Sequence, residues 1–286
     1  MKITQIIRAG KPSLSFEVFP PKTDDKFESV LGAAMDIARL QPSYMSVTYG
    51  AGGGTSVYSA DICKHLLGAG VTPLAHLTCV SSDRERVQTE LAKLRSLGIE
   101  NILALRGDIP AGFCRETAQY RHASELVSEI ARFGGFCIGG ACYPEGHPES
   151  ENSAADIEGL RAKVESGCEF LTTQMFFDNN ILYNFLYRLY RAGVDVPVVA
   201  GVMPVTNASQ IKRLCSINSS ALPQRFVRIV DRYGDNPAAM KQAGIAFATE
   251  QIIDLYANGI NAVHVYSMNK PDVAAAIRAN LSEILR

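Results

Sequence analysis

Long apolar runs and an excess of one charge are both missing from this sequence of 286 residues. No segment approaches the roughly 18 uninterrupted apolar residues that cross a bilayer. The first ten residues also lack the apolar stretch of a secretory signal. Lysine plus arginine (28) nearly balances aspartate plus glutamate (29), and no run of five like charges occurs. We therefore expect no membrane segment and no nucleic-acid partner.

Closely spaced cysteines and histidines are also absent. The sequence has no Cys-x-x-Cys pair and no His-Glu-x-x-His motif, so we expect no metal site. An odd, scattered set of cysteines is typical of reduced thiols that serve as small core residues in a cytoplasmic protein. The seven cysteines are Cys63, Cys79, Cys114, Cys137, Cys142, Cys168 and Cys215.

What the sequence does contain is a regular alternation of short β-rich runs with helix-length segments. Hydrophobic residues make up 47% of the chain, which is enough for a large core. The alternation repeats eight times without a low-complexity linker, which is typical of a closed α/β barrel or a doubly wound sheet. The eight predicted strands span residues 14–19, 44–49, 73–79, 102–108, 137–143, 170–176, 197–203 and 262–268.

The segments between these strands have helical length, and several end at a glycine that would take the left-handed conformation. Residues 206–261 hold more chain than one βα unit needs. There we predict a helix beginning near Asn207, a loop over 216–224 and a long helix over 236–257, beside the barrel mouth. The predicted helices span 27–40, 55–70, 83–97, 123–133, 154–166 and 181–192, and the terminating glycines are Gly70, Gly98, Gly134, Gly167 and Gly193.

Polar side chains gather late in strand after strand, which favours the closed barrel. In a (β/α)8 barrel the outward face of each strand meets apolar helices, whereas inward residues near the carboxyl ends line an open mouth. By this alternation Ser15 and Glu17 point inward, and Leu103 and Leu105 point outward. We predict a single (β/α)8 TIM barrel domain over residues 1–286 with a binding site at its mouth. The expected lining is Glu17, Thr48, His76, Arg106, Asp108, Tyr143, Gln174 and Tyr266.

Glu17 is the leading candidate for chemistry. It lies between Phe16 and Val18, and a carboxylate in apolar surroundings loses hydration, so that its pKa rises and it can hold a proton near neutral pH. The alternative is a carboxylate paired with an inward cation such as Arg106. Asp108 has the same ambiguity, and the residues alone leave both alternatives open.

A glycine-rich segment, residues 49–55, follows the second strand and opens a helix, where a phosphate-binding loop belongs. Its glycines do not complete the G-x-G-x-x-G fingerprint because position 55 is threonine, and no G-K-[ST] follows. We interpret the segment as a βα loop close to a ligand, with a plain turn as the alternative.

Seven motifs occur in order along the chain: FEVFPPK from Phe16, SVTYGAGGG from Ser46, AHLTC from Ala75, ALRGD from Ala104, ACYPEGHPE from Ala141, TTQMFFD from Thr172 and GVMPVTN from Gly201. Together they resemble the methylenetetrahydrofolate reductase family of the bacterial type, over nearly the whole chain. The resemblance implies a (β/α)8 barrel that binds FAD noncovalently at the carboxyl ends of its strands. It also implies a ping-pong reaction. NADH or NADPH reduces the flavin, which then reduces 5,10-methylenetetrahydrofolate to 5-methyltetrahydrofolate for methionine synthesis.

The resemblance also implies roles for single positions. Glu17 matches the general acid that assists opening of the five-membered ring. Asp108 matches an aspartate near the flavin pyrimidine that favours hydride release. Folate contacts fall on Gln174, Gln210 and Lys270. Contacts to FAD fall on Thr48, Tyr49, Ala51, His76, Arg106, Gly107, Asp108, Ala123, Tyr143, His147, Asp156 and Lys163, with Arg106 and Lys163 placed for its phosphates.

Four positions depart from the family pattern. Leu214 stands where a phenylalanine often stacks against nicotinamide and pterin, which leaves the choice between NADH and NADPH unassigned. Lys270 replaces a common arginine with a point charge, and Gly159 and Ala162 stand where polar or basic FAD contacts occur. The family suggests a homo-oligomer, and we expect no regulatory domain. Two alternatives stay open: a flavin barrel of the proline dehydrogenase type, and a folate-binding relative that has lost turnover.

Overall fold

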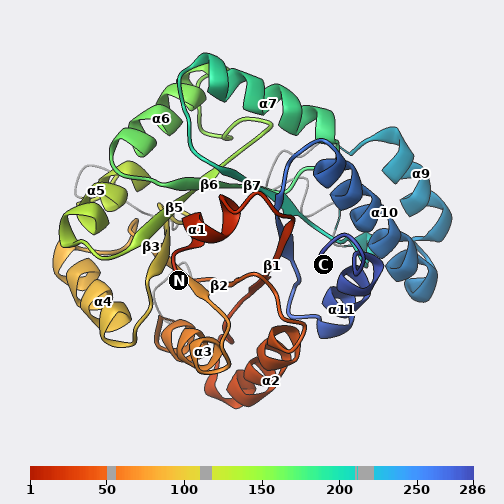
Figure 1. Ribbon diagram of the computed structural model, residues 1–286, viewed down its shortest axis with the longest axis horizontal. Coiled ribbons are helices and arrows are strands. Elements are labelled where there is room, and N and C mark those ends of the chain that lie inside the picture. Colours follow the sequence, from red (N-terminus) through yellow and green to blue (C-terminus); the bar gives the residue numbers. More distant parts are fainter. Residues whose placement is uncertain (50–55, 110–117, 210, 212–221) are drawn as a thin grey trace.

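The computed structural model describes residues 1–49, 56–109, 118–209, 211 and 222–286. Eight parallel strands close into a barrel in chain order, with helices arranged around it (Figure 1). The predicted (β/α)8 barrel is therefore confirmed. The strands are β1 (Ser13–Val18), β2 (Met45–Val47), β3 (Pro73–Thr78), β4 (Asn101–Leu105), β5 (Cys137–Cys142), β6 (Phe170–Thr173), β7 (Val198–Val202) and β8 (Ala262–Tyr266).

Each predicted helix that is described has a counterpart, and the five glycines predicted to end helices all have positive φ. Among the described residues, no helix has the length and apolar character to cross a membrane. The surrounding helices are α2 (Phe27–Ala38), which follows the short 3-10 helix η1 (Asp24–Lys26), and α3 (Ser56–Gly68), α4 (Arg84–Ser96), α5 (Ala123–Phe133), α6 (Ser153–Glu165), α7 (Asn179–Arg191), α10 (Pro237–Ala257) and α11 (Pro271–Asn280).

A short helix that the sequence analysis missed, α1 (Ile3–Ile7), lies across one end of the barrel (Figure 1). Ile3 and Ile7 pack into a cluster with Tyr44, Leu74 and Phe170, which lie at or near the starts of their strands. This apolar contact excludes water from the amino-terminal end of the barrel. The carboxyl ends of the strands are thereby left as the accessible mouth.

The predicted alternation of side chains is confirmed in β1 but is wrong in β4. Ile102 and Ala104 belong to the cluster beneath the outer helices. Leu103 instead packs in the barrel interior, and Leu105 lines a cavity at the mouth. The prediction failed because it placed Arg106 and Asp108 on the inward face of the strand and assigned Leu103 and Leu105 to the opposite face. Both polar residues lie beyond the last residue of β4.

The extra structure before β8 is confirmed by α10, which matches the long helix predicted over 236–257. Residues 210 and 212–221, on which most of the helix predicted from near Asn207 and most of the loop predicted over 216–224 fall, lie outside the described residues. The same region includes a helix that was not predicted, α9 (Gln224–Tyr233), which begins directly after Pro223. Phe226 of α9 stacks on Phe177, and their ring centroids are 5.5 Å apart. In α10, a Cβ on Gly244 would lie only 1.8 Å from the Val205 carbonyl oxygen, so glycine is required for α10 to contact the segment after β7.

The described cysteines are all buried and carry free thiols, consistent with a role as small core residues. Burial raises the pKa of Cys63 and Cys79 to about 12, so these thiols stay protonated and unreactive at neutral pH. Cys114 and Cys215 lie outside the described residues.

Candidate active site

Two contiguous cavities lie at the carboxyl ends of the strands, and Ala141 and Tyr143 line both. The axial cavity has a volume of about 260 Å³, and its lining includes Glu17, His76, Leu105, Gln174, Met203, His264, Tyr266 and Met268. The lateral cavity, beside α5 and α6, has a volume of about 400 Å³, and its lining includes Arg106, Ala123, His147, Glu149, Asp156 and Lys163.

Glu17 lies at the end of β1, and its side chain is 18% exposed. Burial raises the pKa of its carboxyl group from 4.5 to about 7, and a hydrogen bond from Ser46 partly opposes this rise. Arg106 is not its partner, because the Arg106 guanidinium donates two hydrogen bonds, of 2.8 and 2.6 Å, to the Glu149 carboxylate. The geometry therefore favours a carboxyl group that holds a proton near neutral pH over one fixed in an ion pair.

Two buried histidines lie beside Glu17. His76 Nε2 is 3.7 Å from Glu17 Oε2, but burial lowers the pKa of His76 and of His264 to about 3. Both rings are therefore neutral at pH 7, and the contact between His76 and Glu17 is not an ion pair. Neither histidine stabilises the ionised form of Glu17 as a cation would.

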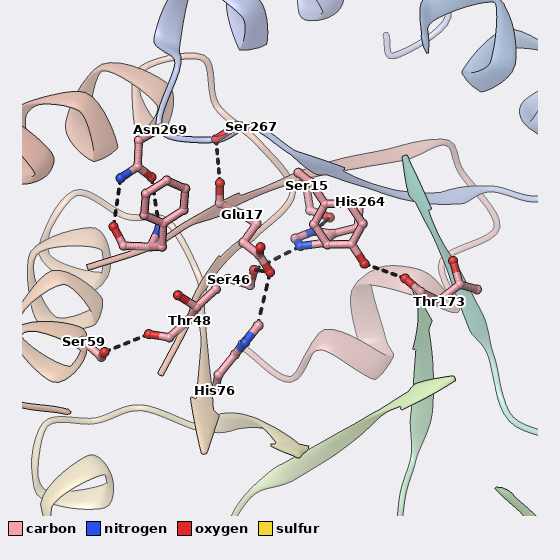
Figure 2. A network of polar contacts seen from close by, with 12 residues as sticks. Ser15, Glu17, Ser46, Thr48, Ser59, His76, Thr173, His264, Ser267 and Asn269 are labelled. Carbon is pink, nitrogen blue, oxygen red and sulfur yellow. Dashed lines mark hydrogen bonds and ion pairs between the residues drawn. The ribbon is translucent and has the colours of Figure 1, made fainter. Parts of the chain in front are cut away.

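A chain of hydrogen bonds extends from Glu17 into the barrel (Figure 2). Ser15 Oγ lies 2.8 Å from His264 Nδ1, and His264 Nε2 lies 3.0 Å from Ser46 Oγ. Ser46 Oγ in turn donates to Glu17 Oε2 over 3.5 Å. Ser46 has a single hydroxyl proton, so it can donate to Glu17 only when His264 carries its own proton on Nε2. The Nε2–H tautomer of His264 thus allows the Ser46 hydrogen bond that lowers the pKa of Glu17, which links the tautomer to the protonation of Glu17.

The axial cavity combines this carboxyl group with apolar and aromatic surface. Tyr266 crosses from β8 to β6, where its hydroxyl donates a 2.5 Å hydrogen bond to the Thr173 carbonyl. A Cβ on Gly201 would lie 2.6 Å from the Tyr266 hydroxyl, so only glycine leaves room for this crossing. Three methionines, Met175, Met203 and Met268, also line the cavity. A mainly apolar cavity with a few convergent polar groups is the usual form of a small-molecule site.

The lateral cavity contains a buried cation. Lys163 Nζ donates a 2.6 Å hydrogen bond to the Ala141 carbonyl, and burial lowers the pKa of this ammonium group. Its side chain passes over β5 at Gly140, where a Cβ would lie 2.7 Å from Lys163 Cδ. A buried ammonium group beside a carbonyl is complementary to an anion such as a phosphate, because the anion would replace the lost hydration.

Most of the predicted site residues line these two cavities. Thr48 and Tyr49 follow β2, and neither is among the lining residues of the two cavities. The axial cavity holds Glu17, His76, Tyr143 and Gln174. The lateral cavity holds Arg106, Ala123, Tyr143, His147, Asp156 and Lys163, together with the departing positions Gly159 and Ala162.

The remaining predicted positions are more scattered. Asp108 is exposed beyond β4. Gly107 beside it has a φ of +89°, and a Cβ there would lie 3.1 Å from the Thr78 side chain. Lys270 lies before α11, where its Nζ donates a 2.7 Å hydrogen bond to Thr206. Ala51, Gln210 and Leu214 lie outside the described residues, as does the glycine-rich loop between residues 50 and 55.

The sequence analysis did not identify Ser46 as the hydrogen-bond partner of Glu17, or His264 as the partner of Ser46. The available signal was the alternation in β2 and β8, which places both side chains on the inward face. Alternation gives the face but not the neighbour across the barrel, and Ser46 and His264 are 218 residues apart in sequence. Glu149 was also missed as the partner of Arg106, because it follows β5 in a segment without regular secondary structure.

The chain matches the methylenetetrahydrofolate reductase family model over residues 2–282. It is 33% identical to methylenetetrahydrofolate reductase (NADH) 1 of Arabidopsis thaliana, with coverage of 99% of this chain and 50% of that protein. It is 31% identical to 5,10-methylenetetrahydrofolate reductase of Escherichia coli (strain K12), with coverage of 94% and 90%. The chain thus spans about half the length of its plant relatives.

A solved structure from Clostridium thermocellum has a TM-score of 0.64 to this chain, at 13% identity and with 99% of each chain covered. It is described as an uncharacterized protein that binds two copies of 5-methyl-5,6,7,8-tetrahydrofolic acid. At this identity the likeness shows the fold alone. The family match over nearly the whole length, with relatives above 30% identity, shows that this chain belongs to the methylenetetrahydrofolate reductase family.

Proposed function

We propose that this protein reduces 5,10-methylenetetrahydrofolate to 5-methyltetrahydrofolate, with FAD as its cofactor and NADH or NADPH as its electron donor. The observation that carries the proposal is the Glu17 carboxyl group, which has a pKa of about 7 and faces a largely apolar cavity at the barrel mouth. The names of the plant relatives specify NADH, which makes it the first donor to test. The product would supply methyl groups for methionine synthesis.

The lateral cavity fits the anionic part of FAD. Lys163 contributes a buried ammonium group whose hydrogen-bond partner is a carbonyl, and Arg106 lies on the same cavity lining. Lys163 would hold the diphosphate, and Arg106 would join it by exchanging the Glu149 carboxylate for a phosphate oxygen. The contiguous axial cavity would admit the flat ring system. When bound, FAD supplies hydride transfer to and from its ring. Ala123, Tyr143, His147 and Asp156 complete the proposed contacts, together with Thr48, Tyr49, His76 and Gly107 at the neighbouring strand ends.

Glu17 would act as the general acid. In its neutral form it holds a proton on a carboxyl oxygen that faces the axial cavity, and it would transfer this proton to the nitrogen that leaves when the five-membered folate ring opens. Protonation makes that nitrogen a better leaving group, and the one-carbon unit becomes the electrophile that accepts hydride. A pKa near the working pH suits this role, because the acid is then both populated and able to release its proton.

Gln174 and Lys270 would orient the folate. The Gln174 side-chain oxygen accepts a 2.9 Å hydrogen bond from the Met175 backbone N–H, which fixes the orientation of its amide group on the axial cavity. We assign this amide to the pterin and the Lys270 ammonium to the glutamate tail. Asp108, exposed beyond β4, would place a negative charge near the flavin pyrimidine and favour hydride release.

The test is an anaerobic mixing experiment on the purified protein, in which flavin absorbance is followed as NADH and then 5,10-methylenetetrahydrofolate are added. The proposal predicts loss of the flavin band with NADH and its return with folate, together with formation of 5-methyltetrahydrofolate. Loss without return would contradict the proposed acceptor. A colourless protein that binds folate but cannot be loaded with FAD would indicate a relative that has lost turnover.

A further inference from the structure

The turn between β8 and α11 is tied to the end of β1 by side chains that the proposed chemistry does not use (Figure 2). Ser267 Oγ donates a 2.5 Å hydrogen bond to the Glu17 carbonyl. Asn269 bonds to both backbone groups of Phe19: its Oδ1 accepts from the Phe19 N–H over 3.0 Å, and its Nδ2 donates to the Phe19 carbonyl over 2.8 Å. We call these three hydrogen bonds the β1 clasp.

The residues that form this turn have an unfavourable backbone conformation. Met268 and Asn269 have φ values of +54° and +53°, in the left-handed region that side chains other than asparagine and aspartate rarely adopt. Such a conformation persists only where surrounding contacts hold it in place, and it is found preferentially at functional sites. Here it directs Met268 to the axial cavity while Asn269 reaches β1.

The side chain of Glu17 has few restraints of its own. It accepts a long hydrogen bond of 3.5 Å from Ser46 Oγ, and the His76 ring at 3.7 Å is neutral. The direction of the carboxyl group therefore depends on where the backbone of β1 ends. The β1 clasp fixes that backbone on both sides of Val18, at Glu17 and at Phe19.

We propose that Asn269 and Ser267 are positioning residues for Glu17, which hold the end of β1 so that the carboxyl group stays turned into the axial cavity and shielded from water. Asparagine suits this position because its amide both accepts and donates, and because it tolerates the left-handed conformation. The catalytic consequence rests on the proposed function, whereas the positioning itself does not.

The titration of Glu17 reports this positioning directly. The titratable groups that face Glu17 are His76 from β3 and His264 and Tyr266 from β8. Burial keeps both histidines neutral and raises the pKa of Tyr266, so none of the three changes charge near pH 7. A fall in the pKa of Glu17 therefore measures an increase in its exposure to water, because loss of the Ser46 hydrogen bond would raise the pKa instead.

The experiment compares Asn269→Gly and Ser267→Ala in the full chain without added ligand. Glycine at position 269 keeps the left-handed conformation without strain but removes two hydrogen bonds, and alanine at position 267 removes the third. Gln41→Gly is the matched control, because Gln41 is exposed between α2 and β2 and has a φ of +54°. The pKa of Glu17 is followed by carbon-13 NMR of labelled glutamate, with its resonance assigned by its loss in Glu17→Gln.

The proposal predicts that Asn269→Gly lowers the pKa of Glu17 by about one unit or more, a tenfold loss of proton affinity. Ser267→Ala should shift it in the same direction, and Gln41→Gly should leave it unchanged. A pKa within about 0.3 unit of the parent value in both clasp variants would overturn the proposal. If Asn269→Gly does not fold, Ser267→Ala decides alone.

This readout needs neither FAD nor folate. If the parent protein does not reduce folate, the proposed function fails while the role of the β1 clasp is still tested by the NMR titration. If the parent protein is active, Asn269→Gly should slow the folate-dependent step about tenfold, in line with the lower proton affinity of Glu17. Its affinity for FAD should remain that of the parent protein.

Discussion

The burial of Glu17 should make the stability of this protein depend on pH in a way that a single substitution removes. Its pKa is about 7 in the folded protein against 4.5 as a free side chain, and each pKa unit corresponds to about 1.4 kcal/mol. Because the pKa is raised in the folded state, protonation of Glu17 stabilises that state. This contribution to the free energy of unfolding is complete below pH 4.5 and is lost as the pH rises through 7. The loss between pH 5 and pH 8 is about 2.5 kcal/mol.

Glu17→Gln keeps the shape of the side chain and cannot ionise. We therefore expect the difference in unfolding free energy between Glu17→Gln and the parent protein to grow by about 2.5 kcal/mol, in favour of the variant, from pH 5 to pH 8. Urea unfolding of both proteins at the two pH values measures this quantity. The other titratable groups contribute equally to the unfolding free energies of both proteins, so their contributions cancel in the difference. Glu151→Gln, which alters an exposed glutamate, serves as the control. A difference that changes by less than about 0.5 kcal/mol would refute the burial argument.

Three further substitutions test other parts of the site. Lys163→Met keeps the length of the side chain but removes the buried ammonium group, so FAD affinity measured by fluorescence titration should fall at least about tenfold; unchanged affinity would exclude Lys163 from the diphosphate site. Gly201→Ala should destabilise the protein by about 1–3 kcal/mol through overpacking, whereas Gly32→Ala in open space on α2 should be neutral or stabilising; equal urea midpoints for the two would refute the close approach. Ser46→Ala removes the hydrogen bond that lowers the pKa of Glu17, so the NMR titration should move to higher pH, and a shift to lower pH would contradict the assigned contact.

The barrel could be predicted from the sequence because its signal is repeated. Eight strands with period-two patterning, each followed by a helix, constrain the fold even where single boundaries are wrong by one to three residues. The end of β4 shows the limit. Arg106 and Asp108 follow the strand and do not belong to it. Alternation counted from them therefore assigned Leu103 and Leu105 to the wrong face of the strand. Polar residues at a strand end report the mouth of the barrel, not the register of the strand.

The elements that the sequence did not reveal depend on tertiary contacts. Five residues of α1 are too few for a helical period, and their stability comes from Ile3 and Ile7 packing into the barrel. α9 follows a proline in a segment rich in turn residues, and Phe226 fixes it through aromatic contacts. Periodicity alone therefore misses elements whose stability comes from distant partners.

The candidate site was partly predictable for the same reason. The motif around Glu17 and the inward alternation indicated a carboxyl group in apolar surroundings, and the structure supplies the pKa near 7. Ser46, His264 and Asn269 come from other strands and turns. The bonded pairs Glu17–Ser46, Ser46–His264 and Phe19–Asn269 are 29, 218 and 250 residues apart in sequence. A single sequence contains no signal for such pairs.

The central claim is that Glu17 is the acid of folate reduction, and the most direct test separates the two half-reactions in Glu17→Gln loaded with FAD. Rapid anaerobic mixing with NADH should reduce the flavin at a rate close to that of the parent protein, because that step needs no proton from Glu17. Mixing the reduced protein with 5,10-methylenetetrahydrofolate should then restore flavin absorbance about 10²–10⁴-fold more slowly than in the parent protein, the range for loss of a general acid. Restoration at the parent rate would contradict the assignment of Glu17.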